Sequence, residues 1–192
     1  MKKHYIDSNQ LLQDAYQLAI EIYTSGYRPD FIVGVWRGGC PIGIAIQEVF
    51  EYLGASTDHI AIRTASYTGI GERNRSVRVH GLSYLVERLQ NNQQVLIVDD
   101  IHDTGLSIDQ IVNDLQQRCG EKNIGVKIAT PFYKPNSNKT QRTPDYFLHS
   151  TNQWVVFPHE LAGLTDDEIL NNKPGVDNIK QRLLALKKQS SP

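Results

Sequence analysis

Two adjacent acids form the part of this 192-residue sequence with the clearest chemistry. Asp99 and Asp100 directly follow Val95–Val98, four apolar residues that are typical of a strand buried on both faces. Carboxylates at such a position can accept hydrogen bonds from the vicinal hydroxyls of a ribose, or hold a hard cation through oxygen. Ligands of open parallel sheets bind beyond the carboxyl ends of the strands, so we expect both acids in a binding crevice.

The turn after the acids offers a second chemistry. Asp103-Thr104-Gly105-Leu106-Ser107 leads into a helix and supplies hydroxyls and backbone N–H groups, which suit a phosphate monoester. Acids for sugar hydroxyls beside a turn for phosphate predict a ribose 5-phosphate site. The simpler alternative is that these residues only cap a helix. A lone Asp-Thr-Gly would favour that alternative, whereas the whole segment Val95–Ser107 favours the binding site.

Val95–Ser107, VLIVDDIHDTGLS, resembles the signature with which type I phosphoribosyltransferases bind 5-phosphoribosyl-1-pyrophosphate (PRPP). Two further landmarks occur in that family's order. Trp36 followed by Arg37-Gly38-Gly39 is similar to the pyrophosphate-binding loop, and Ser66-Tyr67 resembles the start of the flexible loop that covers PRPP. The resemblance spans about residues 31–160 and implies a cis peptide bond between Trp36 and Arg37.

The resemblance also implies a role for each part of the signature. Asp99 and Asp100 would hold the ribose hydroxyls and a Mg²⁺ cofactor, and the turn from Asp103 to Ser107 would hold the 5-phosphate. Asp103 would in addition act as the general base near N7 of a purine. The flexible loop would exclude water, because hydrolysis of PRPP is the competing reaction. His102, at a variable position of the signature, is expected to be a polar residue at the rim.

The acceptor base is indicated by residues outside the signature. Lys134 follows the apolar segment Val126–Tyr133, where 6-oxopurine members of the family carry a base-contacting lysine. Its ammonium can donate to a 6-oxo group and would repel the 6-amino group of adenine. Trp154-Val155 resembles the family's second base element, in which an aromatic ring stacks on the purine and backbone groups read its edge. Glu160 is a candidate for the base edge or for a second metal ion.

Each of these roles has a non-functional alternative: Lys134 could be an ordinary surface lysine, and Trp154 could be a tryptophan of the hydrophobic core. If Lys134 and Trp154 contact the base, we predict an enzyme that transfers ribose 5-phosphate from PRPP to N9 of hypoxanthine, guanine or xanthine. Val156 and His159 depart from the pattern of bacterial xanthine–guanine enzymes, which leaves the three bases open. The other candidate functions are a PRPP-sensing regulator that binds nucleic acid, an interaction protein with a decayed site, and a pyrimidine or orotate enzyme.

Alternating strand-like and helix-like segments predict an α/β fold, with a mostly parallel central sheet flanked by helices and a small C-terminal hood. We expect one domain over residues 1–192, with a core to about residue 134 and a hood beyond it. The expected strands are Phe31–Trp36, His59–Arg63, Val95–Asp100, Ile124–Tyr133, Asp145–His149 and Trp154–Phe157. The expected helices start near Ser8, Pro41, Gly81 and Ser107, and a last one carries Val176, Ile179, Leu183 and Leu186 on one face. Thr64–Val77 is expected to be a long mobile loop.

Composition limits the possible partners. A formal net charge of −1 weakens any bulk attraction to nucleic acid or to an anionic membrane. No apolar run approaches the ~20 residues that span a bilayer, and the first residues lack the apolar core of a secretory signal, so we expect a cytoplasmic protein. Cys40 and Cys119 are too few for a disulfide framework or a zinc site. An apolar face on Pro41–Leu53 would fit a homodimer or higher homo-oligomer, so the expected partners are PRPP, a purine base and further copies of the chain.

Overall fold

The computed structural model of the protein describes residues 2–67 and 76–189. The chain divides into two compact units. The core unit is Asp14–Asn152, and the terminal unit joins Met1–Gln13 to Gln153–Pro192. The expectation of a single domain stays a prediction. No helix in the described ranges combines the length and the apolar character that crossing a bilayer requires.

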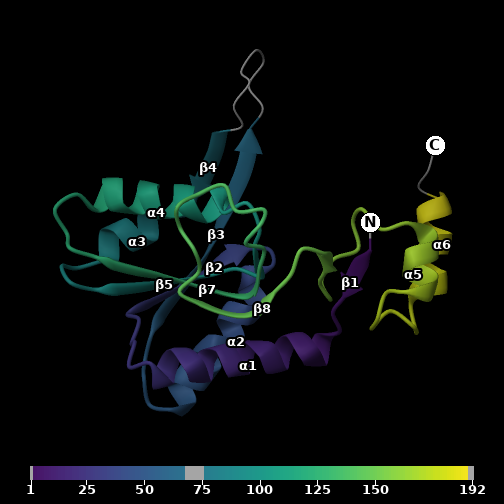
Figure 1. Ribbon diagram of the computed structural model, residues 1–192, viewed down its shortest axis with the longest axis horizontal. Coiled ribbons are helices and arrows are strands. Elements are labelled where there is room, and N and C mark those ends of the chain that lie inside the picture. Colours follow the sequence, from purple (N-terminus) through teal and green to yellow (C-terminus); the bar gives the residue numbers. More distant parts are fainter. Residues whose placement is uncertain (1, 68–75, 190–192) are drawn as a thin grey trace. The chain divides into compact units, whose positions relative to one another are not determined.

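A mostly parallel sheet runs through the core unit (Figure 1). Its described strands follow the order β4-β3-β2-β5-β7-β6. Strand β8 lies off this path and also pairs with β7. Among the described strands of this sheet, only β3 and β4 pair in the antiparallel sense. The strands are β2 (Phe31–Trp36), β3 (Asp58–Tyr67), β4 (Ser76–His80), β5 (Gln94–Val98), β6 (Ile101–His102), β7 (Gly125–Tyr133) and β8 (Tyr146–Ser150).

Helices cover both faces of this sheet, with α1 and α2 on one side and α3 and α4 on the other (Figure 1). They span α1 (Ser8–Thr24), which starts in the terminal unit, α2 (Gly39–Tyr52), α3 (Ser83–Arg88) and α4 (Leu106–Cys119). The predicted α/β fold with a mostly parallel sheet between helices is confirmed.

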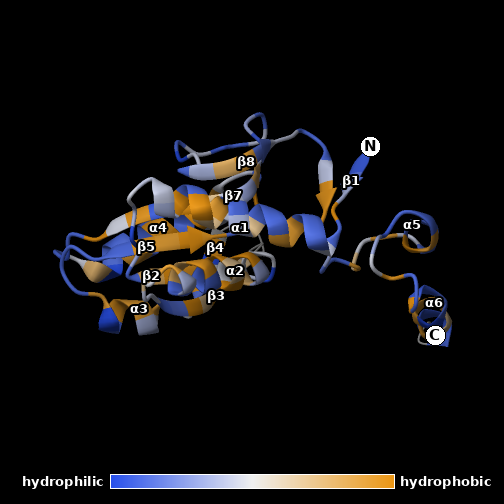
Figure 2. Ribbon diagram, turned by 90° about the horizontal axis from the view of Figure 1, so that it is seen from below, coloured by the Kyte–Doolittle hydropathy of each residue, from blue (hydrophilic) through white to orange (hydrophobic). Residues whose placement is uncertain are grey.

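The apolar pattern of the central strands explains this layering. Side chains alternate along a strand, so Phe31, Val33 and Val35 pack into the core with α3 and α4, while Ile32 faces the α2 side. Val95–Val98 of β5 is fully buried, as expected of a strand covered on both faces. Figure 2 shows the hydrophobic colouring of β5. The core on the α3 and α4 side also contains Ile62, Leu82, Leu85, Leu89, Ile108, Ile111, Val112, Leu115, Cys119 and Ile128.

The terminal unit is built around a short parallel pair of strands, β1 (Lys3–Tyr5) and β9 (Trp154–Val156). The sequence did not indicate β1, because three polar or aromatic residues carry no strand pattern. Helices α5 (Asp166–Asn171) and α6 (Lys180–Gln189) follow, and Thr165 and Glu168 form a capping box at the start of α5.

The predicted face of the last helix is wrong. Val176 and Ile179 precede α6, and Leu184 is its buried residue, whereas Leu186 is 54% exposed. The helix starts later than the apolar spacing suggested. Val176 and Ile179 lie in a turn before it, in which Lys180 N donates a hydrogen bond to Val176 O.

The predicted loop over Thr64–Val77 is wrong at both of its ends. Thr64–Tyr67 belongs to β3, and Ser76 and Val77 belong to β4. Ser66 pairs with Val77 and Tyr67 with Ser76 in an antiparallel ribbon. This pairing provides backbone hydrogen bonds for residues whose composition had indicated a loop. The rest of the predicted flexible loop, residues 68–75, lies outside the described residues.

Candidate functional site

The two acids of the signature lie directly beyond the carboxyl end of β5. Asp99 N donates to Ala129 O of β7 at 3.2 Å, and Asp100 N donates to the Asp99 carboxylate at 2.9 Å. Burial, and next the neighbouring Asp100 carboxylate, raise the pKa of Asp99 well above its usual value. The acids therefore stand where sheet topology predicted them, in a setting that favours a positive partner.

The glycine loop after β2 packs against these acids. A Cβ built on Gly38 would lie 1.8 Å from Oδ2 of Asp100, and one on Gly39 would lie 2.1 Å from the carbonyl oxygen of Val98. Only glycine permits this approach, so the loop and the acids form one surface. The predicted cis peptide bond between Trp36 and Arg37 is present, and Arg37 is exposed.

The turn predicted for phosphate starts α4. Gly105 has a φ of 75°, a left-handed conformation that favours glycine, and no side chain caps the N-terminus of the helix. A small cavity of about 100 Å³ opens here, lined by Asp99, Ile101, His102, Asp103, Thr104, Gly105, Ser107 and Ile108. Free backbone donors at a helix start are a ready anion site, so this cavity suits a phosphate group.

His102 does not lie at the rim, which corrects the expectation from the sequence. The residue is 1% exposed. It pairs with Tyr133 in the ladder between β6 and β7, and its ring meets the Tyr133 ring edge-on at a centroid distance of 5.5 Å. The short strand β6 directs the His102 side chain into the protein. The sequence around His102 has no strand pattern, so this orientation could not be predicted from it.

Lys134 and Asp103 are joined by an ion pair, with Lys134 Nζ donating to Asp103 Oδ2 at 2.8 Å. The Lys134 side chain is 10% exposed and that of Asp103 is 43% exposed. A hydrogen bond from Lys134 N to His102 O, 2.9 Å long, fixes the lysine backbone beside the signature. Lys134 is thus no surface lysine, and its ammonium lies beside the carboxylate of Asp103, which lines the smaller cavity.

The remaining predicted base contacts belong to the terminal unit. Trp154 is 51% exposed on β9, so it is not a core tryptophan, whereas Val155 is buried. Glu160 accepts a hydrogen bond from Phe157 N at 3.1 Å, and buried Lys173 donates to the carbonyl of the same Phe157. The structure does not test base contacts by these residues, and they stay predictions.

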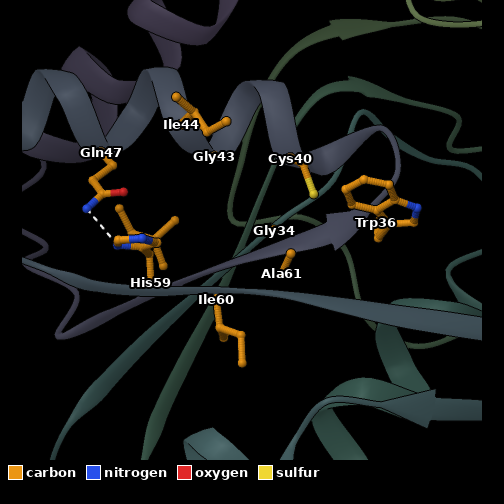
Figure 3. Close-up of a pocket in the computed structure, with 10 residues that line it drawn as sticks. Gly34, Trp36, Cys40, Gly43, Ile44, Gln47, His59, Ile60 and Ala61 are labelled. Carbon is orange, nitrogen blue, oxygen red and sulfur yellow. Dashed lines mark hydrogen bonds between the residues drawn. The ribbon is translucent and has the colours of Figure 1, made fainter.

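A larger cavity of about 320 Å³ lies between α2 and the strands β2 and β3 (Figure 3). Its lining is mostly apolar, and Gln47 and His59 are hydrogen-bonded to each other across 2.9 Å. Trp36 and Cys40 line it near the glycine loop. The described residues that line it include no carboxylate, lysine or arginine that could hold PRPP, so the smaller polar cavity is the candidate phosphate site. The exposed Ile44 beside it is compatible with the expected homo-oligomer, which stays a prediction.

Mg²⁺ is the metal that the predicted chemistry requires. Within residues 2–67 and 76–189, no group of three or more histidine, cysteine or acidic side chains forms a metal site. Mg²⁺ is commonly bound by one or two carboxylates together with substrate phosphates, so Asp99 and Asp100 fit the ion as it would arrive with PRPP.

Several residues near the phosphate turn had no signal in the sequence. Asn138, Thr140 and Arg142 lie in a segment that read only as polar loop, yet Lys139 N of this segment donates to Thr104 O at 3.0 Å. No local pattern marks such a long-range contact. Lys173 is likewise buried without any apolar context that would have indicated it.

Comparison with known proteins agrees with this geometry. Residues 3–163 match the model of the phosphoribosyl transferase domain. No curated protein matches the chain. Among solved structures, a purine phosphoribosyltransferase from Pyrococcus horikoshii Ot3 is 25% identical with a TM-score of 0.66, covering 86% of this chain and 99% of its own.

Two more distant structures share the fold. Xanthine-guanine-hypoxanthine phosphoribosyltransferase from Helicobacter pylori is 19% identical with a TM-score of 0.63, covering 81% of this chain and 90% of its own. A hypothetical protein from Neisseria gonorrhoeae with bound ppGpp is 16% identical with a TM-score of 0.69, covering 97% of each chain. At these identities the likeness shows the fold alone.

Proposed function

The chain belongs to the phosphoribosyl transferase domain family, and we propose that it transfers ribose 5-phosphate from PRPP to N9 of a 6-oxopurine. The observation that best supports a 6-oxopurine acceptor is the ion pair between Lys134 and Asp103. It sets a hydrogen-bond donor for a 6-oxo group beside a carboxylate that can take a proton from the imidazole ring of the purine. The purine and xanthine-guanine-hypoxanthine enzymes among the similar structures support a purine acceptor.

PRPP would be bound by three parts of the core unit. The Asp103–Ser107 turn receives the 5-phosphate, and Asp99 and Asp100 accept hydrogen bonds from the ribose hydroxyls. The exposed Arg37 guanidinium and the backbone of Gly38 and Gly39 face the pyrophosphate. Mg²⁺ bound with PRPP would neutralise charge on the leaving group, and Asp99 and Asp100 would hold it.

The transfer joins purine N9 to C1 of the ribose while the bond from C1 to the pyrophosphate oxygen breaks, and pyrophosphate leaves with the electron pair. The purine loses its imidazole proton, which Asp103 accepts near N7. The Lys134 ammonium has three hydrogens, so it can keep its bond to Asp103 and donate to the 6-oxo group at the same time. Proton acceptance and recognition of the base are therefore coupled through one contact. Trp154, Val155 and Glu160 enter this proposal as base contacts on the sequence resemblance alone.

A panel of acceptors tests the proposal. The protein is mixed with PRPP, Mg²⁺ and one base at a time, and pyrophosphate release is followed with hypoxanthine, guanine, xanthine, adenine and orotate. We expect release with at least one 6-oxopurine and little with adenine or orotate. Release with orotate or adenine in preference to all three 6-oxopurines would contradict the acceptor. Tight PRPP binding without release for any base would instead support a PRPP-sensing regulator.

A further inference from the structure

Three polar side-chain atoms from two segments of the core unit converge on Gly105. A Cβ built on this glycine would lie 2.7 Å from His102 Nε2, 2.7 Å from Thr140 Oγ1 and 2.8 Å from Asn138 Oδ1. These three residues, here called the phosphate-turn brace, fill the space where a side chain would stand. The left-handed Gly105 is thereby confined at the point where the phosphate turn enters α4.

The side chain of the histidine in the brace is almost fully buried. Neither ring nitrogen of His102 has a hydrogen-bond partner within normal geometry among the described residues. Leaving buried polar atoms unpaired is costly, and apolar residues of similar size would avoid that cost. A histidine here is therefore poorly explained by packing alone.

The other two members of the brace are held in place by their own loop. Asn138 Oδ1 accepts from both the backbone N and the hydroxyl of Thr140 at 3.0 Å. Asn138 Nδ2 donates to Arg142 O at 2.8 Å, and the Arg142 side chain reaches α4 through Asp109 at 2.8 Å. With the bond from Lys139 N to Thr104 O, the loop is tied both to the turn and to the helix that the turn begins.

We propose that His102 is a positioning residue for the 5-phosphate of PRPP, acting with Asn138 and Thr140 through the backbone of Gly105. The inference rests on the proposed function, because it concerns the same phosphate turn. The brace holds the turn in its binding conformation before the ligand arrives, and so lowers the ordering cost of phosphate binding. His102 itself touches no reacting atom in this account.

The test compares two ligands that use different parts of the site. Affinities for PRPP with Mg²⁺ and for pyrophosphate with Mg²⁺ are measured by calorimetry for the full chain, together with kcat and KM. The variant His102→Leu removes the ring nitrogens at similar size, and His102→Gln keeps a polar end. His80→Leu, at an exposed position on β4, is the matched control.

We expect His102→Leu to weaken PRPP binding and raise its KM by about 10-fold, with pyrophosphate affinity and the KM of the base within about 2-fold of wild type. His102→Gln should recover most of the PRPP affinity, and His80→Leu should change nothing. Equal weakening of both ligands would contradict positioning through the phosphate turn and indicate a general structural role.

A second variant keeps the inference testable if His102→Leu does not fold. Thr140→Val exchanges one hydroxyl for a methyl group in a half-buried loop, and we expect it to weaken PRPP about 3-fold without changing pyrophosphate binding. Unchanged PRPP affinity in folded variants at both positions would overturn the inference. Failure of the wild-type protein to bind PRPP would instead overturn the proposed function, so the two failures are distinct.

Discussion

Lys134 Nζ lies 2.8 Å from Asp103 Oδ2, although the two residues are 31 positions apart in the chain. The lysine follows β7 and the aspartate follows β6, and pairing of these strands brings the two side chains to the same edge of the sheet. One contact thus joins the signature for PRPP to the residue that indicates the acceptor base. The proposed coupling of base recognition to proton acceptance depends on it.

Asp103→Asn should separate binding from turnover. The amide keeps the size of the side chain and can still contact Lys134 through its oxygen, but it cannot accept the purine proton. We expect PRPP affinity within a few-fold of wild type and a fall in kcat of about 10²–10³-fold, the usual effect of losing a general base. Steady-state kinetics and calorimetry measure the two quantities, and an unchanged kcat would remove Asp103 from the role of base.

Lys134→Gln should weaken the base far more than PRPP. Loss of a charged hydrogen bond to a 6-oxo group typically costs a factor of about 10–100 in affinity, so the KM of the 6-oxopurine substrate should rise by that amount. The KM of PRPP should stay within a few-fold, because the lysine does not face the phosphate or the ribose in this account. Lys188→Gln on exposed α6 controls for the loss of one positive charge. Equal effects on both substrates would contradict the assigned role.

Gly39→Ala should damage the pyrophosphate loop, because its Cβ would meet the carbonyl oxygen of Val98 at 2.1 Å. We expect the KM of PRPP to rise at least about 10-fold as the loop shifts away from the acids. Gly43→Ala is the matched control on the same helix, since the nearest atoms there would lie at 3.7 and 3.8 Å. That control should raise the melting temperature by about 2–4 °C through helix propensity. Normal PRPP kinetics in Gly39→Ala would show that the close packing is not needed.

Glu168 should give the terminal unit a measurable sensitivity to acid. Its carboxylate pairs with Lys3 Nζ at 2.5 Å, and hydrogen bonds from Lys3 and from the Thr165 backbone lower its pKa to about 2. A pKa lower in the folded than in the unfolded state stabilises the fold above the unfolded value of 4.5, and this stabilisation is lost as the pH falls from there towards 2.

Thermal unfolding of Glu168→Gln measures this effect. We expect a lower melting temperature than wild type at pH 7 and a difference that shrinks below pH 4.5. Glu87→Gln, at an exposed site on α3, should show no such dependence on pH. A difference between Glu168→Gln and wild type that is the same at pH 7 and at pH 3 would contradict the assignment.

Local patterns in the sequence predicted the centre of the fold well. Val95–Val98 carries its own burial signal, and the acids and the turn follow it directly, so the strand, the crevice residues and the start of α4 required no long-range information. The resemblance to a known family added Lys134 and the cis bond before Arg37.

Long-range contacts explain what the sequence did not predict. Thr64–Tyr67 read as loop because its strand character depends on pairing with β4, and His102 read as exposed because only the ladder between β6 and β7 turns it inward. The phosphate-turn brace has the same origin, since Asn138 and Thr140 meet Gly105 across more than thirty residues of chain. Local sequence patterns do not indicate contacts between residues so far apart in the chain.

A competition for PRPP tests the central claim most directly. The wild-type protein is given PRPP, Mg²⁺ and equal concentrations of adenine and of the 6-oxopurine that releases pyrophosphate fastest in the acceptor panel, and the nucleotides formed are separated and quantified. We expect the monophosphate of that 6-oxopurine to accumulate with an equal amount of pyrophosphate, while adenosine monophosphate stays near background. Predominant formation of adenosine monophosphate, or consumption of PRPP without any nucleotide, would contradict it.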